Sequence, residues 1–412
     1  MQMLYRCCAG LDVHKDTVVA CIRRVDDAGK AREQVRTFGT MTGALLELAD
    51  WLAEQGVRHV AMESTGVYWK PVWHLLEGRF ELILVNAQHI KQVPGRKTDV
   101  KDCQWIAQLL QHGLLRPSFV PPQPIRELRD LTRQRAQLIA ERGSVANRIQ
   151  GVLEDANVKL GSVATDVLGE SGRAMLRALI DGRDDPEELA ELARGRLRAK
   201  IPALRLALRG KVTGHHRFLM RLLLDHYEAL EALIGRLGER VEEVLALYAE
   251  AVARLETIPG VGRRVAEVVV AELGAEMGQF PTARHLASWA GMCPGNNESA
   301  GKRRSGKTTK GSRWLRAALV QAAHAAGRSK GTYLGSLYRR LASRRGAKRA
   351  AVAVGHTLLG IIYCVLSRGA NYQDLGPEYL ERLEPERLTR QLVRRLERLG
   401  HDVTLKPKDE AA

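Results

Sequence analysis

Four acidic residues in the first quarter of the chain have the types and spacing of a divalent-metal site. Asp99 and Asp102 stand three apart at the start of an apolar-periodic stretch, GRKTDVKDCQWIAQLL, residues 95–110. Residues three apart on a helix are neighbours, so the two carboxylates would repel each other unless a cation lay between them. Asp12 and Glu63 each follow a short apolar run that is typical of a strand. The simpler alternative for Asp99 and Asp102 is two favourable acids near the positive end of a helix.

The elements around these acids predict an α/β domain over residues 1–120. We expect strands at 6–12, 17–24, 33–38, 59–62 and 81–85, and helices at 42–55 and 67–77. Ligands collect at strand ends in open α/β sheets, so the four acids are expected to converge. Unpaired buried carboxylates are costly, and Mg²⁺ or Mn²⁺ suits an all-oxygen ligand set. Two such ions assist phosphoryl transfer. His14 is interpreted as a turn residue.

The net charge indicates the class of partner, and the cysteines indicate the redox setting of the protein. The 412 residues suggest two or three domains, and the net charge of +17 indicates a polyanion such as nucleic acid. A basic membrane-surface protein is the competitor, but no segment has 18 uninterrupted apolar residues and the N-terminus lacks a secretory pattern. The six cysteines are scattered without CxxC spacing, which fits a reduced, cytoplasmic setting.

Residues 121–256 predict an extended helical region. Prolines at 117, 121, 122 and 124 mark its start. One heptad line runs through positions 131, 138, 145 and 152, and the alternate line carries Arg135 and Arg142, so this seam is imperfect. A cleaner apolar seam spans residues 230–255. The two seams either pack as an antiparallel pair within the chain or join subunits.

The segment Thr257 to Leu273, TIPGVGRRVAEVVVAEL, resembles a helix-hairpin-helix turn. Gly260 and Gly262 would let backbone amides approach a phosphate, with Arg263 beside them at the positive end of the next helix. Such contacts are independent of base sequence. An ordinary loop between two helices is the alternative.

A long basic stretch follows. Residues 302–373 hold sixteen Lys and Arg and no Asp or Glu, which predicts a nucleic-acid surface rather than an ordinary solvated face. Trp314, Tyr333 and Tyr338 either stack on bases or fill a core. Residues 350–366 predict an apolar core helix, and residues 378–400 a charged amphipathic helix. The cations expected to bind nucleic acid are Lys302, Arg303, Arg304, Lys307, Lys310, Arg313 and Arg316.

Ser299 lies at the entrance of this stretch, between Asn297 and Gly301. A serine in such a loop is commonly a turn residue, and its hydroxyl is a weak nucleophile until neighbouring cations or a polarised phosphate assist it.

The words GLDVHKDT, MESTGVYW, KTDVKD and GMCPGNNESAGK together resemble the DEDD insertion-sequence transposases whose recombination is guided by a structured bridge RNA. The resemblance implies a RuvC-like domain of the ribonuclease H fold, with Asp12, Glu63, Asp99 and Asp102 as metal ligands. It implies Ser299 as the nucleophile, although Ser305 and Ser312 are near neighbours and Ala300 replaces the glycine that many relatives have next to the serine. It also implies a dimer or tetramer and a composite active site between subunits.

The sequence therefore predicts a prokaryotic, cytoplasmic, Mg²⁺-dependent DNA transposase that acts through a phosphoserine intermediate. We expect a RuvC-like domain at 1–120, a coiled-coil assembly region at 121–256, a serine transposase domain at 257–380 with a mostly helical fold, and a charged tail at 381–412. A RuvC-like endonuclease such as a junction resolvase, using water, explains the acids without Ser299. A nucleic-acid scaffold explains only the charge, and no Arg, His and Tyr set favours a tyrosine recombinase.

Overall fold

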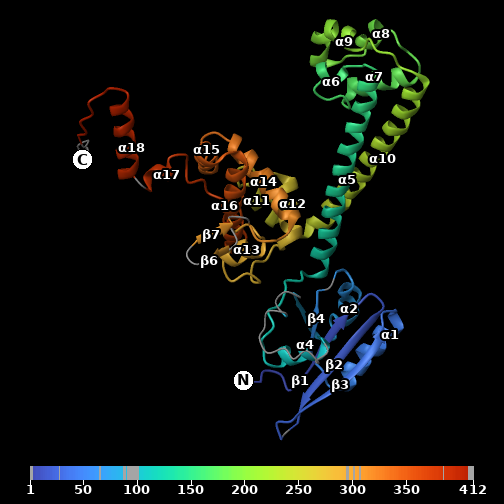
Figure 1. The fold of residues 1–412 in the computed structure, drawn as a ribbon, viewed down its shortest axis with the longest axis vertical. Helices are drawn as coiled ribbons and strands as arrows, with labels where there is room; N and C mark the ends of the chain where they lie inside the picture. Colours follow the sequence, from blue (N-terminus) through green and yellow to red (C-terminus); the bar gives the residue numbers. More distant parts are fainter. Residues whose placement is uncertain are drawn as a thin grey trace. The chain divides into compact units, whose positions relative to one another are not determined.

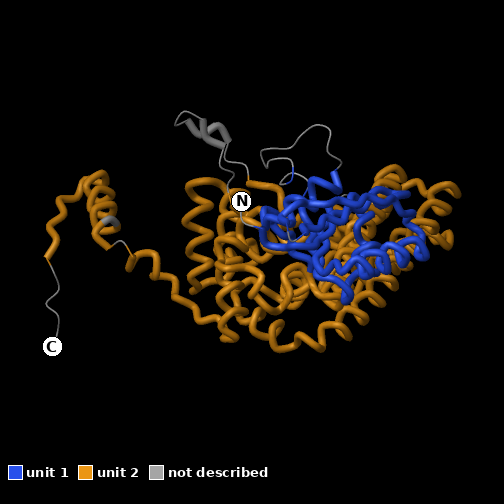
Figure 2. Tube along the Cα trace, turned by 90° about the horizontal axis from the view of Figure 1, so that it is seen from below, with its two compact units in different colours: residues 1–120 blue, residues 121–412 orange. Residues whose placement is uncertain are grey.

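The computed structural model describes residues 3–26, 28–64, 66–86, 90, 102–293, 297–299, 302–305, 308–383 and 385–406. The chain divides into two compact units, residues 1–120 and 121–412 (Figure 2). The first is a mixed α/β domain and the second is almost entirely helical. The predicted α/β N-terminal domain and helical C-terminal region are therefore confirmed.

A five-stranded sheet forms the centre of the first unit, in the order β3-β2-β1-β4-β5 (Figure 1). The first three strands are antiparallel, and β4 and β5 run parallel to β1. This order is compatible with a ribonuclease H-like fold. The elements are β1 (Cys7–Val13), β2 (Thr17–Val25), β3 (Ala31–Gly39), α1 (Thr42–Glu54), β4 (His59–Glu63), α2 (Trp69–Leu76), β5 (Glu81–Val85) and α4 (Asp102–Gln111).

The alternation of side chains along β1 divides the two faces of this sheet. Ala9, Leu11 and Val13 belong to the apolar core that includes residues of α1 and α2. Cys8 belongs to a second core with residues of α4. Helices therefore cover both faces, and a side chain two residues beyond Gly10 lies on the α4 face.

Gly10 allows α4 to approach β1 closely. A Cβ atom at this position would lie 2.3 Å from the carbonyl oxygen of Cys103 and 2.5 Å from the backbone nitrogen of Ala107. Both atoms belong to the backbone of α4 and cannot turn aside as a flexible side chain would. The absence of a side chain at Gly10 thus fixes how deeply the helix that begins at Asp102 lies on the sheet.

The second unit begins with a long helical hairpin. Helices α5 (Gln123–Asp155) and α10 (Gly214–Leu245) run side by side in Figure 1. Contacts between side chains show that the two helices are antiparallel. Arg142 pairs with Glu231 at 3.4 Å, and Asp155, further along α5, contacts His216, which comes earlier on α10, at 2.9 Å. Between them, short helices build a separate apolar core: α6 (Leu160–Val163), α7 (Glu170–Ile180), α8 (Pro186–Glu191), η1 (Gly195–Lys200) and α9 (Ile201–Ala207).

The two predicted seams thus pair within one chain, and both heptad lines of α5 contribute buried residues. Val145 is buried on the first line, and Leu128, Arg135 and Ile149 are buried on the line that carries the arginines. Arg135 can be buried there because a buried glutamate far along the chain, Glu267, neutralises it.

A helical bundle follows, with a small hairpin inserted. It contains η2 (Ala246–Tyr248), α11 (Ala249–Glu256), α12 (Arg263–Leu273), α13 (Ala283–Trp289), β6 (Asn297–Ser299), β7 (Lys302–Ser305), α14 (Arg313–Arg328), α15 (Tyr333–Arg345) and α16 (Ala347–Arg368). The chain continues through α17 (Tyr379–Arg382) and α18 (Pro385–Arg398). Helix α16 packs against α13, α14 and α15, as the predicted core helix should.

Among the helices that the structure describes, α16 alone is long enough and apolar enough to cross a membrane, judged by length and composition. Core helices of globular proteins pass the same test. Its buried residues include Val354, Leu358, Leu359 and Ile362, which fits its position at the centre of the bundle.

Replacing Gly10 with alanine should destabilise the first unit by about 1–3 kcal/mol or more, because α4 must move away from the sheet. Urea unfolding followed by circular dichroism measures this change. Gly43→Ala is the control, since a Cβ there meets nothing within 4 Å and alanine suits a helix. Equal stability of the two variants would contradict the close approach of α4.

Candidate active site and nucleic-acid interface

Three of the four predicted acids are described, and they lie on one face of the sheet. The β1–β4 register pairs Leu11 with Met62, so Asp12 and Glu63 are the next residues of two neighbouring parallel strands. Leu11 and Met62 belong to the core on the α1 and α2 face, so the alternation of the strands puts Asp12 and Glu63 on the α4 face. Asp102 is the first residue of α4, which packs on β1. The fold therefore directs these three carboxylates to the same side and the same end of the sheet.

The electrostatics of Asp12 agree with this placement. Partial burial raises the pKa of Asp12, and the Asp102 carboxylate raises it further. His14 opposes the shift, because its Nε2 lies 3.1 Å from Oδ2 of Asp12. The backbone of His14 donates to Thr17 O at 2.9 Å, which confirms its predicted place in the turn. The Asp102 carboxylate is thus close enough to disfavour the ionised form of Asp12.

The chemistry of these donors fits a divalent cation. Carboxylate oxygens are the ligands that Mg²⁺ and Mn²⁺ prefer, and a cation would remove the repulsion that raises the pKa of Asp12. Asp99, the fourth predicted ligand, lies outside the described residues. Within the described part of the chain, no three His, Cys, Asp or Glu side chains gather closely enough to hold a metal ion. A complete ligand set thus requires a contribution beyond these side chains.

Ser299 ends the first strand of a short antiparallel hairpin. Its backbone pairs with Lys302 across the β6–β7 turn, and Asn297 pairs with Ser305. The structure describes the backbone of this hairpin but not its side chains. Arg303 and Arg304 also lie on β7, whereas Lys307 is outside the described residues. The predicted nucleophile and three predicted cations therefore share one hairpin.

Arg316 joins the two ends of the segment 291–309, which carries this hairpin. Its guanidinium donates to the carbonyl oxygens of Gly291 and, at 2.9 Å, of Thr309. The backbone nitrogen of Thr309 also donates to Cys293 O at 3.3 Å. Arg316 was predicted to bind nucleic acid; in this structure it holds the two ends of the segment together. Its contact with nucleic acid stays a prediction.

Gly260 and Arg263 of the predicted phosphate-binding turn make contacts within the protein. Gly260 has φ +89°, and a Cβ there would lie 2.4 Å from Ala322 O of α14. Arg263, which follows Gly262 at the start of α12, pairs with Glu242 and lies 3.8 Å from Glu256. The glycine thus serves close packing between the turn and α14, and phosphate binding here stays a prediction.

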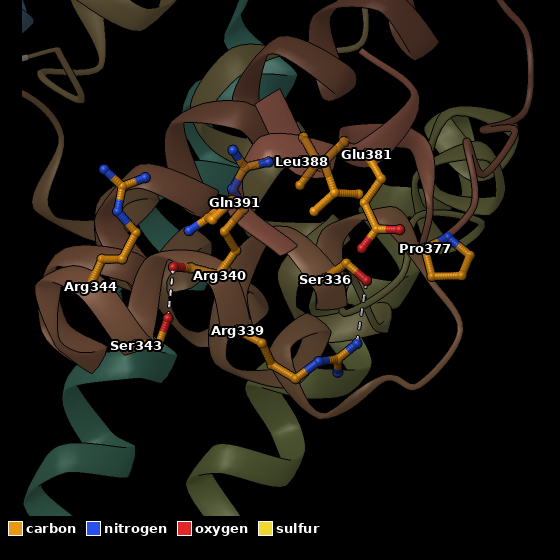
Figure 3. Close-up of a pocket in the computed structure, with 10 residues that line it drawn as sticks. Ser336, Arg339, Arg340, Ser343, Arg344, Pro377, Glu381, Leu388 and Gln391 are labelled. Atoms are coloured by element: carbon orange, nitrogen blue, oxygen red, sulfur yellow. Dashed lines mark hydrogen bonds between the residues drawn. The ribbon is translucent and has the colours of Figure 1, made fainter. Parts of the chain in front are cut away.

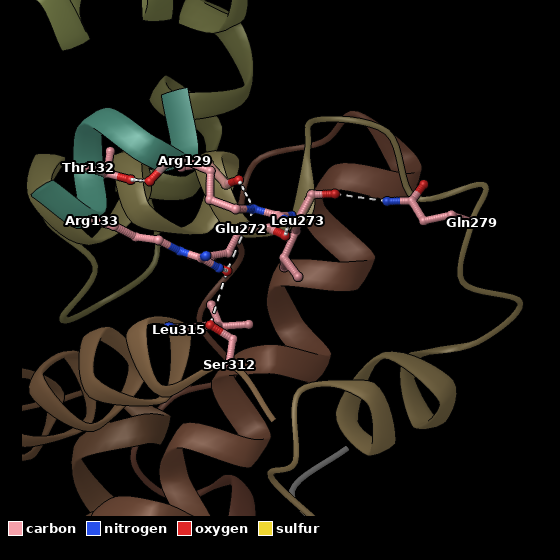
Figure 4. A network of polar contacts seen from close by, with 9 residues as sticks. Arg129, Thr132, Arg133, Glu272, Leu273, Gln279, Ser312 and Leu315 are labelled. Carbon is pink, nitrogen blue, oxygen red and sulfur yellow. Dashed lines mark hydrogen bonds and ion pairs between the residues drawn. The ribbon is translucent and has the colours of Figure 1, made fainter. Parts of the chain in front are cut away.

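A buried carboxylate joins three helices of the second unit (Figure 4). Glu272 on α12 is 1% exposed and accepts two hydrogen bonds from Arg133 of α5, at 2.7 and 2.8 Å. Ser312, the N-cap of α14, donates to Glu272 at 3.0 Å. Arg129 donates to Glu272 O at 2.7 Å, and burial lowers the pKa of this guanidinium to about 10. This network fixes the helix that follows the Ser299 segment.

A second buried ion pair lies on the same two helices. Arg135 of α5 and Glu267 of α12 are 4% and 0% exposed and are joined through Nη2 and Oε2. Arg264 also contacts Glu267, at 3.0 Å. Together with Glu272, this pair attaches the base of the helical hairpin to α12.

Exposed cations gather on α14 and α15. Of the predicted set, Lys310 and Arg313 are exposed. Arg339, Arg340 and Arg344 were not among the cations predicted from the sequence. Together with Glu381 they line a cavity of about 620 Å³ (Figure 3). The acid-free composition of residues 302–373 was the available signal, but the walls from α17 and α18 follow only from the fold. The cavity adds a cationic groove to the predicted interface.

Comparison with known proteins places this arrangement in a class. A family model of DEDD transposases of the IS110 type matches residues 9–158, and the model described as the IS116/IS110/IS902 transposase family matches residues 252–339. The first range contains the four acids and the second contains Ser299 and the start of the basic stretch. The class is that of DNA-processing transposases with a DEDD domain, which suggests divalent-metal use.

The two matched ranges together cover more than half of the sequence, and the chain belongs to the IS110/IS116 family of insertion-sequence transposases. It is 27% identical over 375 residues to the transposase for insertion sequence element IS1111A of Coxiella burnetii, covering 88% of this chain and 90% of that protein. It is 26% identical to the 43.6 kDa protein of insertion element IS110 from Streptomyces coelicolor, covering 70% and 75%.

The raised pKa of Asp12 predicts that Asp12→Asn increases stability in the absence of metal. Ionised Asp12 is disfavoured in the fold, so its charge costs stability at neutral pH, and the cost disappears as the pH falls below the ordinary carboxyl pKa of about 4. Thermal unfolding in EDTA should show a melting point a few degrees higher for the variant at pH 7. This difference should shrink as the pH approaches 4. Exposed Asp16→Asn is the control, and a lower melting point for Asp12→Asn at pH 7 would contradict the burial of this charge.

Glu272→Ala should destabilise the second unit by about 3–5 kcal/mol, because Arg129 and Arg133 would lose their carboxylate partner. Chemical denaturation of the full chain measures the effect. The exposed pair of Glu243 with Arg240 supplies the control, Glu243→Ala, with an expected cost of about 0–1 kcal/mol. Similar losses in both variants would show that the Glu272 network does not hold the helices together.

Proposed function

We propose that this transposase cuts and exchanges DNA strands through a covalent phosphoserine intermediate on Ser299, with Mg²⁺ at Asp12, Glu63, Asp99 and Asp102. The observation that supports the acidic half is that the Asp102 carboxylate, at the start of α4, helps to raise the pKa of Asp12 near the end of β1. The serine half is supported by the resemblance of GMCPGNNESAGK and by the hairpin position of Ser299. Both halves fall within the ranges matched by the family models.

The proposed step transfers a phosphoryl group from DNA to serine and needs no external energy source. Oγ of Ser299 attacks the scissile phosphorus, an O–P bond to serine forms, and the bond from phosphorus to the DNA 3′ oxygen breaks. The serine proton leaves Oγ, and the departing oxygen gains a proton to become a free 3′ hydroxyl. Attack by the 3′ hydroxyl of another strand on the phosphoserine forms a new bond from phosphorus to DNA, releases the serine hydroxyl and completes the exchange. The number of phosphoester bonds is unchanged.

The residues of the chain have separate roles in this step. Asp12, Glu63, Asp99 and Asp102 would hold Mg²⁺, or Mn²⁺ in its place, which would neutralise charge on the phosphate. Lys302, Arg303 and Arg304 follow the serine by three to five positions and would strengthen the positive field around the attacked phosphate. Lys310 and Arg313 would bind the neighbouring backbone phosphates, since they are exposed cations.

The assembly is a further part of the proposal. The family resemblance implies that Ser299 of one subunit meets the acids of another in a dimer or tetramer. It also implies that a structured bridge RNA pairs with target and donor DNA in the bacterial or archaeal cytoplasm. The net charge of +17 supports binding of a polyanion but does not itself specify a second nucleic acid.

Ser299→Ala should abolish protein–DNA adducts that resist denaturation, because no other group would form the ester. The assay mixes purified protein, RNA, cognate DNA and Mg²⁺ and separates the products under denaturing conditions. Ser305→Ala, on the opposite strand of the same hairpin, is the control and should keep the adduct.

Equal adduct yield from Ser299→Ala would contradict the serine mechanism. The alternative, a RuvC-like endonuclease that uses water, predicts another result: full DNA cleavage by Ser299→Ala without any adduct, and loss of cleavage in Asp12→Asn. The placement of three acids on one sheet face accommodates this alternative, but it leaves the Ser299 segment without a role.

A further inference from the structure

A cavity of about 540 Å³ lies between α5, α12 and α14, and its described lining residues differ from those assigned to the catalytic step. Its volume is in the range of small-ligand pockets. Its lining includes Arg133 and Arg135 of α5, Arg264 of α12, and Trp314 and Ala317 of α14.

Most of the lining is apolar, with an aromatic ring at one side. Alanine, valine and isoleucine side chains from all three helices form its walls. Trp314 is half-buried, and the guanidinium of Arg313 lies over its ring at 4.5 Å. The other two aromatic residues considered for base stacking are also half-buried, and both contact residues of the protein: Tyr333 contacts Tyr379, and Tyr338 is hydrogen-bonded to His324. Trp314 is thus the aromatic side chain of that set that faces a cavity.

The cavity also has a buried hydrogen-bond donor. Arg135 is 4% exposed, and its Nη2 is occupied by Glu267. Its Nη1 has no hydrogen-bond partner among the residues that the structure describes. A buried N–H group without an acceptor is unfavourable, so a ligand that brings an oxygen or nitrogen acceptor would be stabilised here.

The charged lining residues are all cationic. Arg133, Arg135 and Arg264 line the cavity, and the carboxylates near them, Glu272 and Glu267, are already engaged by arginines. A largely apolar cavity that has one donor without an acceptor among its lining residues, and several arginines around it, is suited to an aromatic ring that carries an acceptor and is attached to a phosphate. Nucleotides have this chemistry.

We propose that this cavity takes up one unpaired nucleobase of a nucleic-acid strand bound by the transposase. The base stacks on Trp314, accepts a hydrogen bond from Nη1 of Arg135, and leaves its phosphate near Arg264. A base inside a duplex cannot enter, because it remains stacked and paired until it is extruded. The site would therefore recognise a single-stranded or unpaired position, in DNA or in RNA. This site rests on the proposed binding of nucleic acid by this transposase and not on the Ser299 chemistry.

The test measures binding without cleavage, using full-length protein with Ser299→Ala in EDTA. Single-stranded DNA and RNA carrying 5-iodouracil, and a matched duplex, serve as probes. Photocrosslinking followed by peptide mapping should place the crosslink on the peptide that contains Trp314. The single strands should crosslink and the duplex should not.

Ala317→Leu should fill the cavity and weaken single-strand binding roughly 5- to 100-fold, the range for loss of one base stack. Ala317 is exposed, so the fold should tolerate the change. Ala325→Leu lies on α14 outside the lining and is the control, with unchanged affinity. Trp314→Phe should retain more affinity than Trp314→Leu.

Equal affinities of Ala317→Leu and Ala325→Leu, or a crosslink elsewhere in the chain, would overturn the proposal. A crosslink of similar yield with duplex would also overturn it, because duplex bases are not free to enter. These outcomes leave the serine mechanism untouched, and loss of adducts in the cleavage assay leaves this binding test untouched.

Discussion

The close contact between α4 and β1 is the constraint on which the acidic site depends. Because Gly10 has no side chain, the backbone of α4 lies directly on the strand, and the first residue of that helix approaches the end of β1. Two carboxylates are thereby brought near each other in a partly buried place, which is electrostatically unfavourable in the protein alone. A fold that maintains such repulsion through exact packing is typical of a site that binds a cation.

The second unit uses the opposite arrangement, in which charges are buried and neutralised. Glu272 and Glu267 lie inside the protein, and arginines of α5 satisfy both. A buried ion pair of this kind adds little net stability, but removal of one partner is costly. The two pairs therefore specify how α5 meets α12, and through Ser312 they also fix the start of α14. The helix after the Ser299 segment is positioned by polar contacts as well as by apolar packing.

Local patterns in the sequence predicted the elements of the first unit well. Alternation identified the strands, and the short run before Asp12 and before Glu63 placed both acids at strand ends. Asp102 was expected near a helix start, and it is the first residue of α4. Local patterns could not predict how closely α4 packs on the sheet, because this distance depends on Gly10 and on residues more than ninety positions away.

Long-range contacts of the second unit could not be predicted from local patterns. Arg135 was interpreted as a defect in an apolar seam, whereas Glu267, 132 positions later, makes it part of the buried line. The close approach of Gly260 to α14 was not expected either, and phosphate binding at this turn stays a prediction. Neither relation has a local signal. The motif around Ser299 identified the family, but the role of the serine follows from resemblance and not from described side-chain geometry.

The account is tested most directly by the identity of the residue that carries DNA after cleavage. Protease digestion of a trapped protein–DNA adduct, followed by mass spectrometry, identifies the peptide and the side chain joined to the nucleotide. The account predicts a phosphoester on Ser299 in a reaction that requires Asp12. A nucleotide attached to another side chain, or cleaved DNA without any attached peptide, would contradict it.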